Sequence, residues 1–186
     1  MNKEMIVSVF GSSRPRENDP EYAEARELGR ALAEKGLAIC TGAYGGTMEA
    51  VSRGAKEAGG KTYGVTAEFF PAAQANKWVD VEVRVKTWQD RLFEIIRLGD
   101  GFVACKGGTG TLAELAVAWE MMNKSVMPPK PFVALGEFWT PILQCVRAVE
   151  VAQENPRAEM QAQILRTVPT PEEAAEFLWN SLKKEM

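Results

Sequence analysis

The sequence predicts a three-layer, doubly wound α/β fold, in which a mainly parallel sheet carries helices on both faces. Three observations predict it: short apolar runs alternate with helical patterns, most of these runs are continuous, and three of them end in Gly- or Ser-rich turns. Continuous apolar strands are typical of parallel sheets that connecting helices cover on both faces. The 186 residues suit one such domain, so 1–186 is predicted to be a single α/β domain.

Apolar runs predict the strands, and apolar residues at helical spacing between Gly or Pro boundaries predict the helices. The strands are expected at Met5–Phe10, Leu37–Cys40, Lys61–Thr66, Gly101–Cys105 and Phe132–Leu135, with a further short one near Val81–Val85. The helices are expected at Glu21–Lys35, Thr47–Ala58, Trp88–Leu98, from the 106–111 loop to about Met122, at Phe138–Val151 and at Pro171–Lys184. Asn155-Pro156 is expected to break the chain. This order of elements is Rossmann-like.

The chain contains no histidine. Its absence excludes a Ser-His-Asp or Cys-His nucleophile, a His-ligated metal and an imidazole proton carrier. Any catalytic work must fall to carboxylates, Arg, Lys, Tyr, Cys, water or backbone amides. The net charge of -3 offers no general surface for nucleic acid or an anionic membrane, although a local anion site is compatible with it.

Three cysteines, Cys40, Cys105 and Cys145, form no C-x-x-C motif and are odd in number, which predicts reduced thiols. No segment reaches the roughly 18 apolar residues of a membrane span, and the N-terminus enters a strand rather than a signal peptide. We therefore expect a cytoplasmic protein without a membrane partner.

Glycines cluster in loops that follow three predicted strands: Gly11-Ser12-Ser13, residues 42–46 and residues 106–111. These loops share the carboxyl edge of a parallel sheet, where ligands bind. A strand, Gly-Gly-Thr-Gly-Thr and a helix can cradle a phosphate with backbone amides, hydroxyls and the positive helix end. Neither a Walker A loop nor G-x-G-x-x-G is present, which favours a mononucleotide or another small phosphate. The alternative is that the glycines only make tight turns.

Two charged residues near these loops have ordinary alternatives. Glu114 lies three residues beyond Thr111 and could serve only as a capping or macrodipole residue. Arg91 and Arg97 could be solvated charges on an amphipathic helix. The connection from Ala67 to Asp80 carries several aromatic residues, and lids and subunit contacts are common roles for such loops.

Several motifs together resemble the Lonely Guy family of nucleoside 5′-monophosphate phosphoribohydrolases, which activate cytokinins. The residues 106–114, KGGTGTLAE, resemble its PGGxGTxxE signature, and residues 42–48, GAYGGTM, are similar to its GGGxxGLM loop. Phe10-Gly11-Ser12-Ser13 resembles its first-strand turn, and residues 91–94 fall at its R-K-x-E helix motif. The departures are Lys106 for the family proline, Ala113 for the first paired glutamate, and Thr41 and Ala43 for glycines.

The resemblance implies a single nucleotide-binding domain that hydrolyses the N-glycosidic bond of AMP or an N6-modified AMP, with no cofactor and no metal. Glu114 would stabilise the oxocarbenium-like state and orient water, and Arg91 would position the nucleotide. The phosphate positions are Lys106, Gly107, Gly108, Thr109, Gly110 and Thr111, and the sugar or base positions are Ser12, Arg14, Gly45, Gly46 and Met48.

Two other classes compete with the hydrolase. The same loops also resemble molybdenum-cofactor carrier proteins, so a non-catalytic nucleotide or cofactor carrier is the alternative. A lysine decarboxylase, a label that the family often carries, is disfavoured because no histidine can stack on pyridoxal phosphate and the chain is short.

An apolar stripe on one predicted helix is compatible with association. Leu112, Leu115, Ala116, Trp119 and Met122 share one helix, and either core packing or a subunit contact explains them. The family resemblance favours a homodimer.

Overall fold

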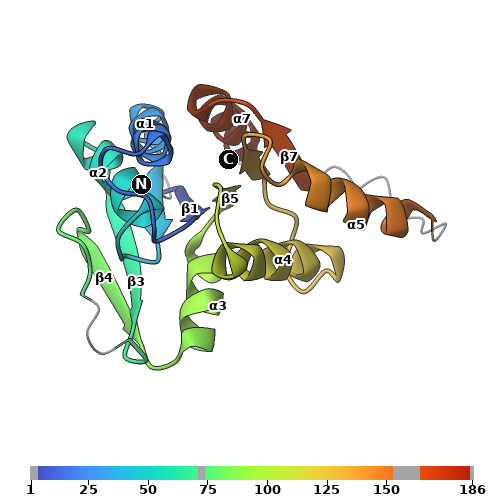
Figure 1. Ribbon diagram of the computed structural model, residues 1–186, viewed down its shortest axis with the longest axis horizontal. Coiled ribbons are helices and arrows are strands. Elements are labelled where there is room, and N and C mark those ends of the chain that lie inside the picture. The colour runs from blue at the N-terminus through green and yellow to red at the C-terminus, as the bar shows by residue number, and fades with distance from the viewer. Residues whose placement is uncertain (1–3, 71–73, 153–163, 185–186) are drawn as a thin grey trace.

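The computed structural model describes residues 4–70, 74–152 and 164–184 (Figure 1). The strands are β1 (Ile6–Phe10), β2 (Ala38–Thr41), β3 (Thr62–Ala67), β4 (Val81–Val85), β5 (Gly101–Ala104), β6 (Phe132–Leu135) and β7 (Leu165–Val168). The helices are α1 (Pro20–Glu34), α2 (Thr47–Glu57), α3 (Trp88–Leu98), α4 (Thr109–Asn123), α5 (Thr140–Ala152) and α7 (Pro171–Lys183). The break expected at Asn155-Pro156 lies outside the described residues.

The strands form one parallel sheet in the order β4-β3-β2-β1-β5-β6-β7. From β1 the chain first builds the sheet outward through β2 and β3 to β4. It then crosses back and places β5 on the other side of β1, where Val7 is opposite Gly101. The direction of winding therefore reverses between β1 and β5, the place where doubly wound folds bind ligands.

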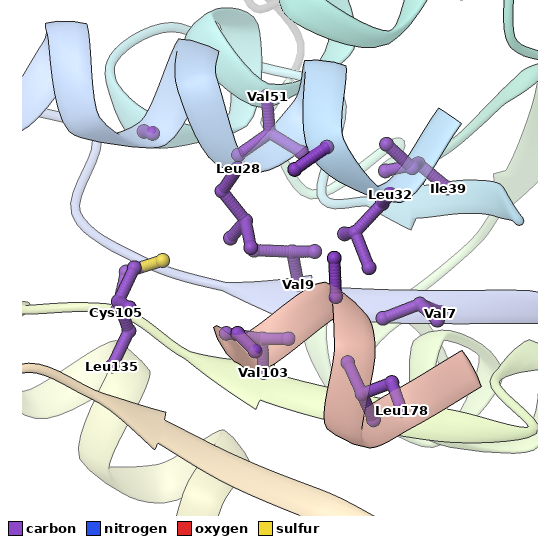
Figure 2. Close-up of a cluster of buried hydrophobic side chains, with 14 of the residues drawn as sticks. Val7, Val9, Leu28, Leu32, Ile39, Val51, Val103, Cys105, Leu135 and Leu178 are labelled. Carbon is purple, nitrogen blue, oxygen red and sulfur yellow. The ribbon is translucent and has the colours of Figure 1, made fainter. Parts of the chain in front are cut away.

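Helices cover both faces of this sheet, so the predicted three-layer α/β fold is confirmed. On one face α1, α2 and α7 bury Leu28, Leu32, Val51 and Leu178 against the sheet (Figure 2). On the other face α3 and α4 pack against a cluster of three strand aromatics. These are Phe10, Phe102 and Phe132, whose ring centroids lie 5.3–6.0 Å apart.

Local sequence explains where several helices begin and end. Pro20 occupies the first turn of α1, where its missing N–H is not needed. Gly36 follows the same helix with a φ of 78°, a left-handed conformation that glycine adopts without strain. Thr87 and Asp90 form a reciprocal capping box at the start of α3.

The predicted elements are present, with ends shifted by one or two residues, but β7 was missed. Of its four residues, LRTV, only the first and the last are buried because β7 is an edge strand, and Arg166 is exposed. No continuous apolar run marks it in the sequence. None of the helices in the described ranges is both long and apolar enough to span a bilayer.

Candidate active site

A cleft of about 1000 Å³ opens over the switch point between β1 and β5. Its walls come from the loops that follow β1, β2, β3, β5 and β6, together with the first turns of α1, α2, α3 and α4. Residues far apart in the sequence therefore meet at one sheet edge, as expected for a doubly wound fold. The cleft has a buried inner end near α3 and an exposed outer end near the start of α1.

Arg91 defines the inner end, and its side chain is only 7% exposed. Its Nε donates to the carbonyl oxygen of Val65 at 2.9 Å and its Nη2 to that of Gly42 at 2.7 Å. The guanidinium also lies 4.9 Å from the Tyr44 ring centroid. Burial lowers the pKa of Arg91, while Glu114 opposes that shift. The alternative that Arg91 is an ordinary solvated charge is therefore wrong, whereas Arg97 is exposed and pairs with Glu94.

The glycine at position 42 is a steric requirement of this arrangement. A Cβ there would lie 1.6 Å from Nη2 of Arg91 and 2.8 Å from Sδ of Met48. Real Cβ atoms do not approach other atoms so closely, so Arg91 reaches the β2 loop only because residue 42 has no side chain. Sequence reasoning had not assigned Gly42 to the site.

Glu114 projects from α4 into the same cleft and is partly buried. Burial raises the pKa of its carboxyl to about 7, and the nearby Arg91 charge limits the increase. Among the described residues no hydrogen bond or ion pair holds the carboxyl. Glu114 also lies beyond the first turn of α4, which contains no acidic residue, so it does not cap the helix. A carboxyl that titrates near neutrality in a cleft is a candidate for acid–base or electrostatic chemistry.

The loop between β5 and α4 contains two kinds of glycine. A Cβ at Gly107 would lie 2.1 Å from Oγ1 of the buried Thr111, so the fold itself requires glycine there. Gly108, the N-cap of α4, and Gly110 would meet nothing within 4 Å. Protein packing does not explain these last two glycines, whereas close approach of a ligand to the backbone does.

The β1 loop forms the adjoining wall. Ser12 Oγ accepts a hydrogen bond from the Arg14 amide at 3.1 Å, and the Thr47 amide donates to the Ser12 carbonyl at 2.8 Å. Gly46 makes this contact feasible, because it has a φ of 70° and a Cβ there would lie 2.4 Å from the Ser12 oxygen. Gly46 therefore positions the β1 loop rather than lining the cleft.

At the outer end, Lys106 Nζ lies 2.7 Å from Glu21 Oε1. The two side chains are 54% and 39% exposed, and both line the cleft. Lys106 also lies 6.0 Å from the ring centroid of Phe138. Trp139 fixes this region, because its ring packs edge-on against Phe138 and its Nε1 donates to the Cys105 carbonyl at 2.9 Å.

Three of the four helices whose first turns line the cleft begin differently from α3 and α7. In the described structure, α1, α2 and α4 have no side-chain hydrogen bond at their N-caps. In contrast, Thr87 caps α3 and Thr170 caps α7. The three uncapped helices follow β1, β2 and β5, the strands at the switch point. The positive ends of three helix dipoles therefore converge there, which favours an anion.

The structure gathers most of the residues that the sequence singled out. The cleft is lined by Ser12, Arg14, Met48, Arg91, Lys106, Gly107, Gly108, Thr109, Gly110, Thr111 and Glu114. Gly45 and Gly46 are not among its lining residues. The sequence reasoning did not find Glu21, Tyr44, Phe70, Trp88 or Phe138, which also line it. Of these five residues, Tyr44 could have been predicted, because it lies within the glycine loop of residues 42–46.

Fold and cleft together define a Rossmann-like α/β protein with a cleft at the switch point of its sheet. The family model described as SLOG cluster4 matches residues 4–158. The chain belongs to the SLOG cluster4 family, and the resemblance to Lonely Guy proteins is confirmed.

Relatives in this group include both enzymes and binding proteins. The cytokinin riboside 5′-monophosphate phosphoribohydrolase of Rhodococcoides fascians is 29% identical over 153 residues, which cover 78% of this chain and 75% of that protein. An uncharacterised protein of Archaeoglobus fulgidus is 31% identical over 144 residues, covering 75% and 91%. The solved structure of the molybdenum cofactor binding protein from Rippkaea orientalis has a TM-score of 0.70 and 26% identity, covering 96% and 97%.

Proposed function

We propose that this chain is a nucleoside 5′-monophosphate phosphoribohydrolase, acting as one nucleotide-binding domain over 1–186. Its substrate is AMP or an N6-modified AMP, and its products are the free base and ribose 5-phosphate. The observation that carries the proposal is that Glu114, with a pKa of about 7, lines the same cleft as the buried Arg91, whose charge acts on it. The Gly-Thr loop of residues 106–111 forms the adjacent wall.

The phosphate is expected at the start of α4. The amides of Gly108 and Gly110, the Thr111 hydroxyl and the helix dipole would hold it, and the space beside both glycines leaves room for it. Lys106 and Arg14 would add positive charge. Ser12 and Met48 would then border the sugar or base, and Thr109 the phosphate.

In the proposed reaction, water adds to the anomeric carbon as the bond from that carbon to the base nitrogen breaks. One water proton is released and the departing base acquires one. The Glu114 carboxylate would orient the water and stabilise the positive charge that develops on the sugar. Arg91 would stabilise the negative charge that develops on the base, as a fixed cation whose position two carbonyl oxygens hold.

The test is chromatography of AMP and N6-modified AMP after incubation with the protein. We expect base release, and we expect Glu114→Gln to lower its rate by about 100-fold or more, the range typical of a lost acid–base group. Glu120→Gln is the matched control, because Glu120 is on the exposed side of the same helix. Equal rates in the wild type and Glu114→Gln would reject the hydrolase.

A non-catalytic carrier of a nucleotide or molybdenum cofactor is the second candidate. Two observations favour it: Ala113 and Lys106 depart from the hydrolase motif, and the likeness to a molybdenum cofactor binding protein covers nearly the whole chain. Calorimetry that finds tight nucleotide or pterin binding, with no base released at high protein concentration, would favour the carrier.

We also propose a homodimer through the face covered by α3, α4 and α5. This face has a hollow of about 800 Å³ near the exposed Phe93 and Val126. On α5, the exposed Ile142, Val146 and Val149 form an apolar stripe at helical spacing. A second copy of the chain would cover these surfaces. Light scattering at micromolar concentration should give twice the chain mass, and Val146→Asp should shift it toward the monomer.

A further inference from the structure

The ion pair at the outer end of the cleft lies beside the expected phosphate position. Lys106 immediately precedes the glycines of the 106–111 loop. Its Nζ donates a hydrogen bond to the carboxylate of Glu21, which lies in the first turn of α1. We infer that Glu21 competes with the ligand's phosphate for Lys106 and so limits the affinity of the site for phosphate monoesters. This inference rests on the proposed function only in placing a phosphate at the start of α4.

The exchange of Lys106 between Glu21 and a phosphate costs little free energy, because both side chains are exposed. Both side chains are more than one-third exposed, so water and salt screen the bond between them. Exposed ion pairs of this kind change an equilibrium by no more than about fivefold. A phosphate dianion at an uncapped helix N-terminus therefore has enough attraction to take the lysine from its carboxylate.

Glu21 remains a charged competitor at neutral pH. Its hydrogen bond to Lys106 lowers the pKa of the carboxyl, and its place in the first turn of α1 puts it near the positive end of that helix. When a phosphate binds Lys106, Glu21 can stay ionised beside α1. When the phosphate leaves, the carboxylate can recover the lysine.

Arg91 cannot take part in such an exchange. It is buried, and two of its donor groups already bind backbone carbonyls. Of these two cations, Lys106 is thus the one that can exchange partners. In the proposed reaction, both substrate and product carry the phosphate, so an uncontested lysine would also hold ribose 5-phosphate. Glu21 thereby favours release of the product.

The test measures binding of ribose 5-phosphate by calorimetry, with ribose as the probe that lacks the phosphate. We expect Glu21→Gln to tighten ribose 5-phosphate binding by up to about fivefold. Lys106→Met should weaken it by about tenfold, the effect of losing one charge-assisted hydrogen bond. In the double variant, Glu21→Gln should add nothing. Binding of ribose should not change in any of these proteins.

Glu24→Gln is the matched control, because it removes the same charge one turn further along α1 without removing a bond to Lys106. It should tighten binding less than Glu21→Gln does. The inference is overturned if the wild type does not bind ribose 5-phosphate, if Lys106→Met leaves binding unchanged, or if Glu21→Gln tightens binding equally without Lys106. A chain that shows the expected pattern but releases no base from AMP would keep this inference and lose the hydrolase.

Discussion

The inner and outer ends of the cleft each place a cation near a carboxyl group, but they differ in burial, and of the two only the outer end holds an ion pair among the described residues. Arg91 at the inner end is 7% exposed, whereas the side chain of Lys106 at the outer end is 54% exposed. Burial raises the pKa of Glu114 toward neutrality, whereas the bond to Lys106 lowers that of Glu21. A buried cation held by backbone carbonyls can keep a fixed position and influence the proton affinity of a nearby carboxyl, whereas an exposed ion pair can exchange partners.

Gly42→Ala should give the largest effect, because the new Cβ would displace the buried Arg91 from two carbonyl oxygens. We expect a loss of about 3 kcal/mol in the free energy of unfolding, the upper range for overpacking a buried site. Denaturant unfolding measures it. Gly45→Ala is the control, because its Cβ would have no neighbour closer than 4.0 Å. Similar losses of stability in both variants would contradict the proposal that Gly42 is needed to hold Arg91 in place.

The pH dependence of stability should identify Glu114. Its folded pKa of about 7 exceeds the unfolded value of 4.5, so the folded state binds more protons between these values. Proton binding by Glu114 therefore contributes to stability. This contribution is fully present below pH 4.5, and it is lost as the carboxyl ionises when the pH rises through 7. Glu114→Gln should stabilise the protein above pH 7 by up to about 3 kcal/mol, and by much less at pH 4.5.

The rate of base release should increase with pH where the stabilising contribution of Glu114 decreases, because the proposed reaction needs the ionised carboxylate. We expect the rate to rise as the pH passes through about 7. A flat rate profile from pH 5.5 to 8.5, measured by chromatography, would contradict this assignment for Glu114.

Arg91→Lys tests whether charge alone suffices at the inner end. A lysine keeps the charge but cannot donate to both the Val65 and Gly42 carbonyls from a planar fork. We expect a loss of about 2 kcal/mol in unfolding free energy, since a buried acceptor is left without its partner. Arg97→Lys, on the exposed side of α3, should change stability by less than about 0.5 kcal/mol.

The smallest effect on stability is expected at the outer end. Lys106→Met should leave the free energy of unfolding nearly unchanged, because it removes only a screened surface pair. Thermal or denaturant unfolding without ligand measures it. A loss as large as that of Arg91→Lys would show that the two ends are energetically alike.

The fold was largely predictable because its signals are local. Continuous apolar strands, Gly stops and helical spacing located most elements, and the short strand expected near Val81–Val85 is β4. The edge strand β7 was missed because an edge does not require an apolar run. Its pairing partner, β6, precedes it by about thirty residues, so nothing local reveals it.

The residues of the candidate site could be predicted only where they belong to a recognisable sequence motif. The residues of the 106–111 loop, Arg91 and Glu114 could be named from their motifs. Glu21 and Phe138 could not, because they enter the cleft only when the loops after β1 and β6 meet beside β5. Gly45 and Gly46 fall in a motif, yet neither lines the cleft. Gly46 instead allows the β1 loop to pack closely, because its φ is 70° and it has no side chain.

The uncapped starts of α1, α2 and α4 have a thermodynamic consequence. These helices lack the side-chain oxygens that Thr87 and Thr170 supply to α3 and α7. A bound anion would complete the hydrogen bonding of helix ends in the folded chain and would have no such site in the unfolded chain. At a concentration 100 times its dissociation constant, a ligand of this kind stabilises a fold by about 2.7 kcal/mol. The melting temperature of this protein should thus rise with the concentration of the proposed nucleotide ligand.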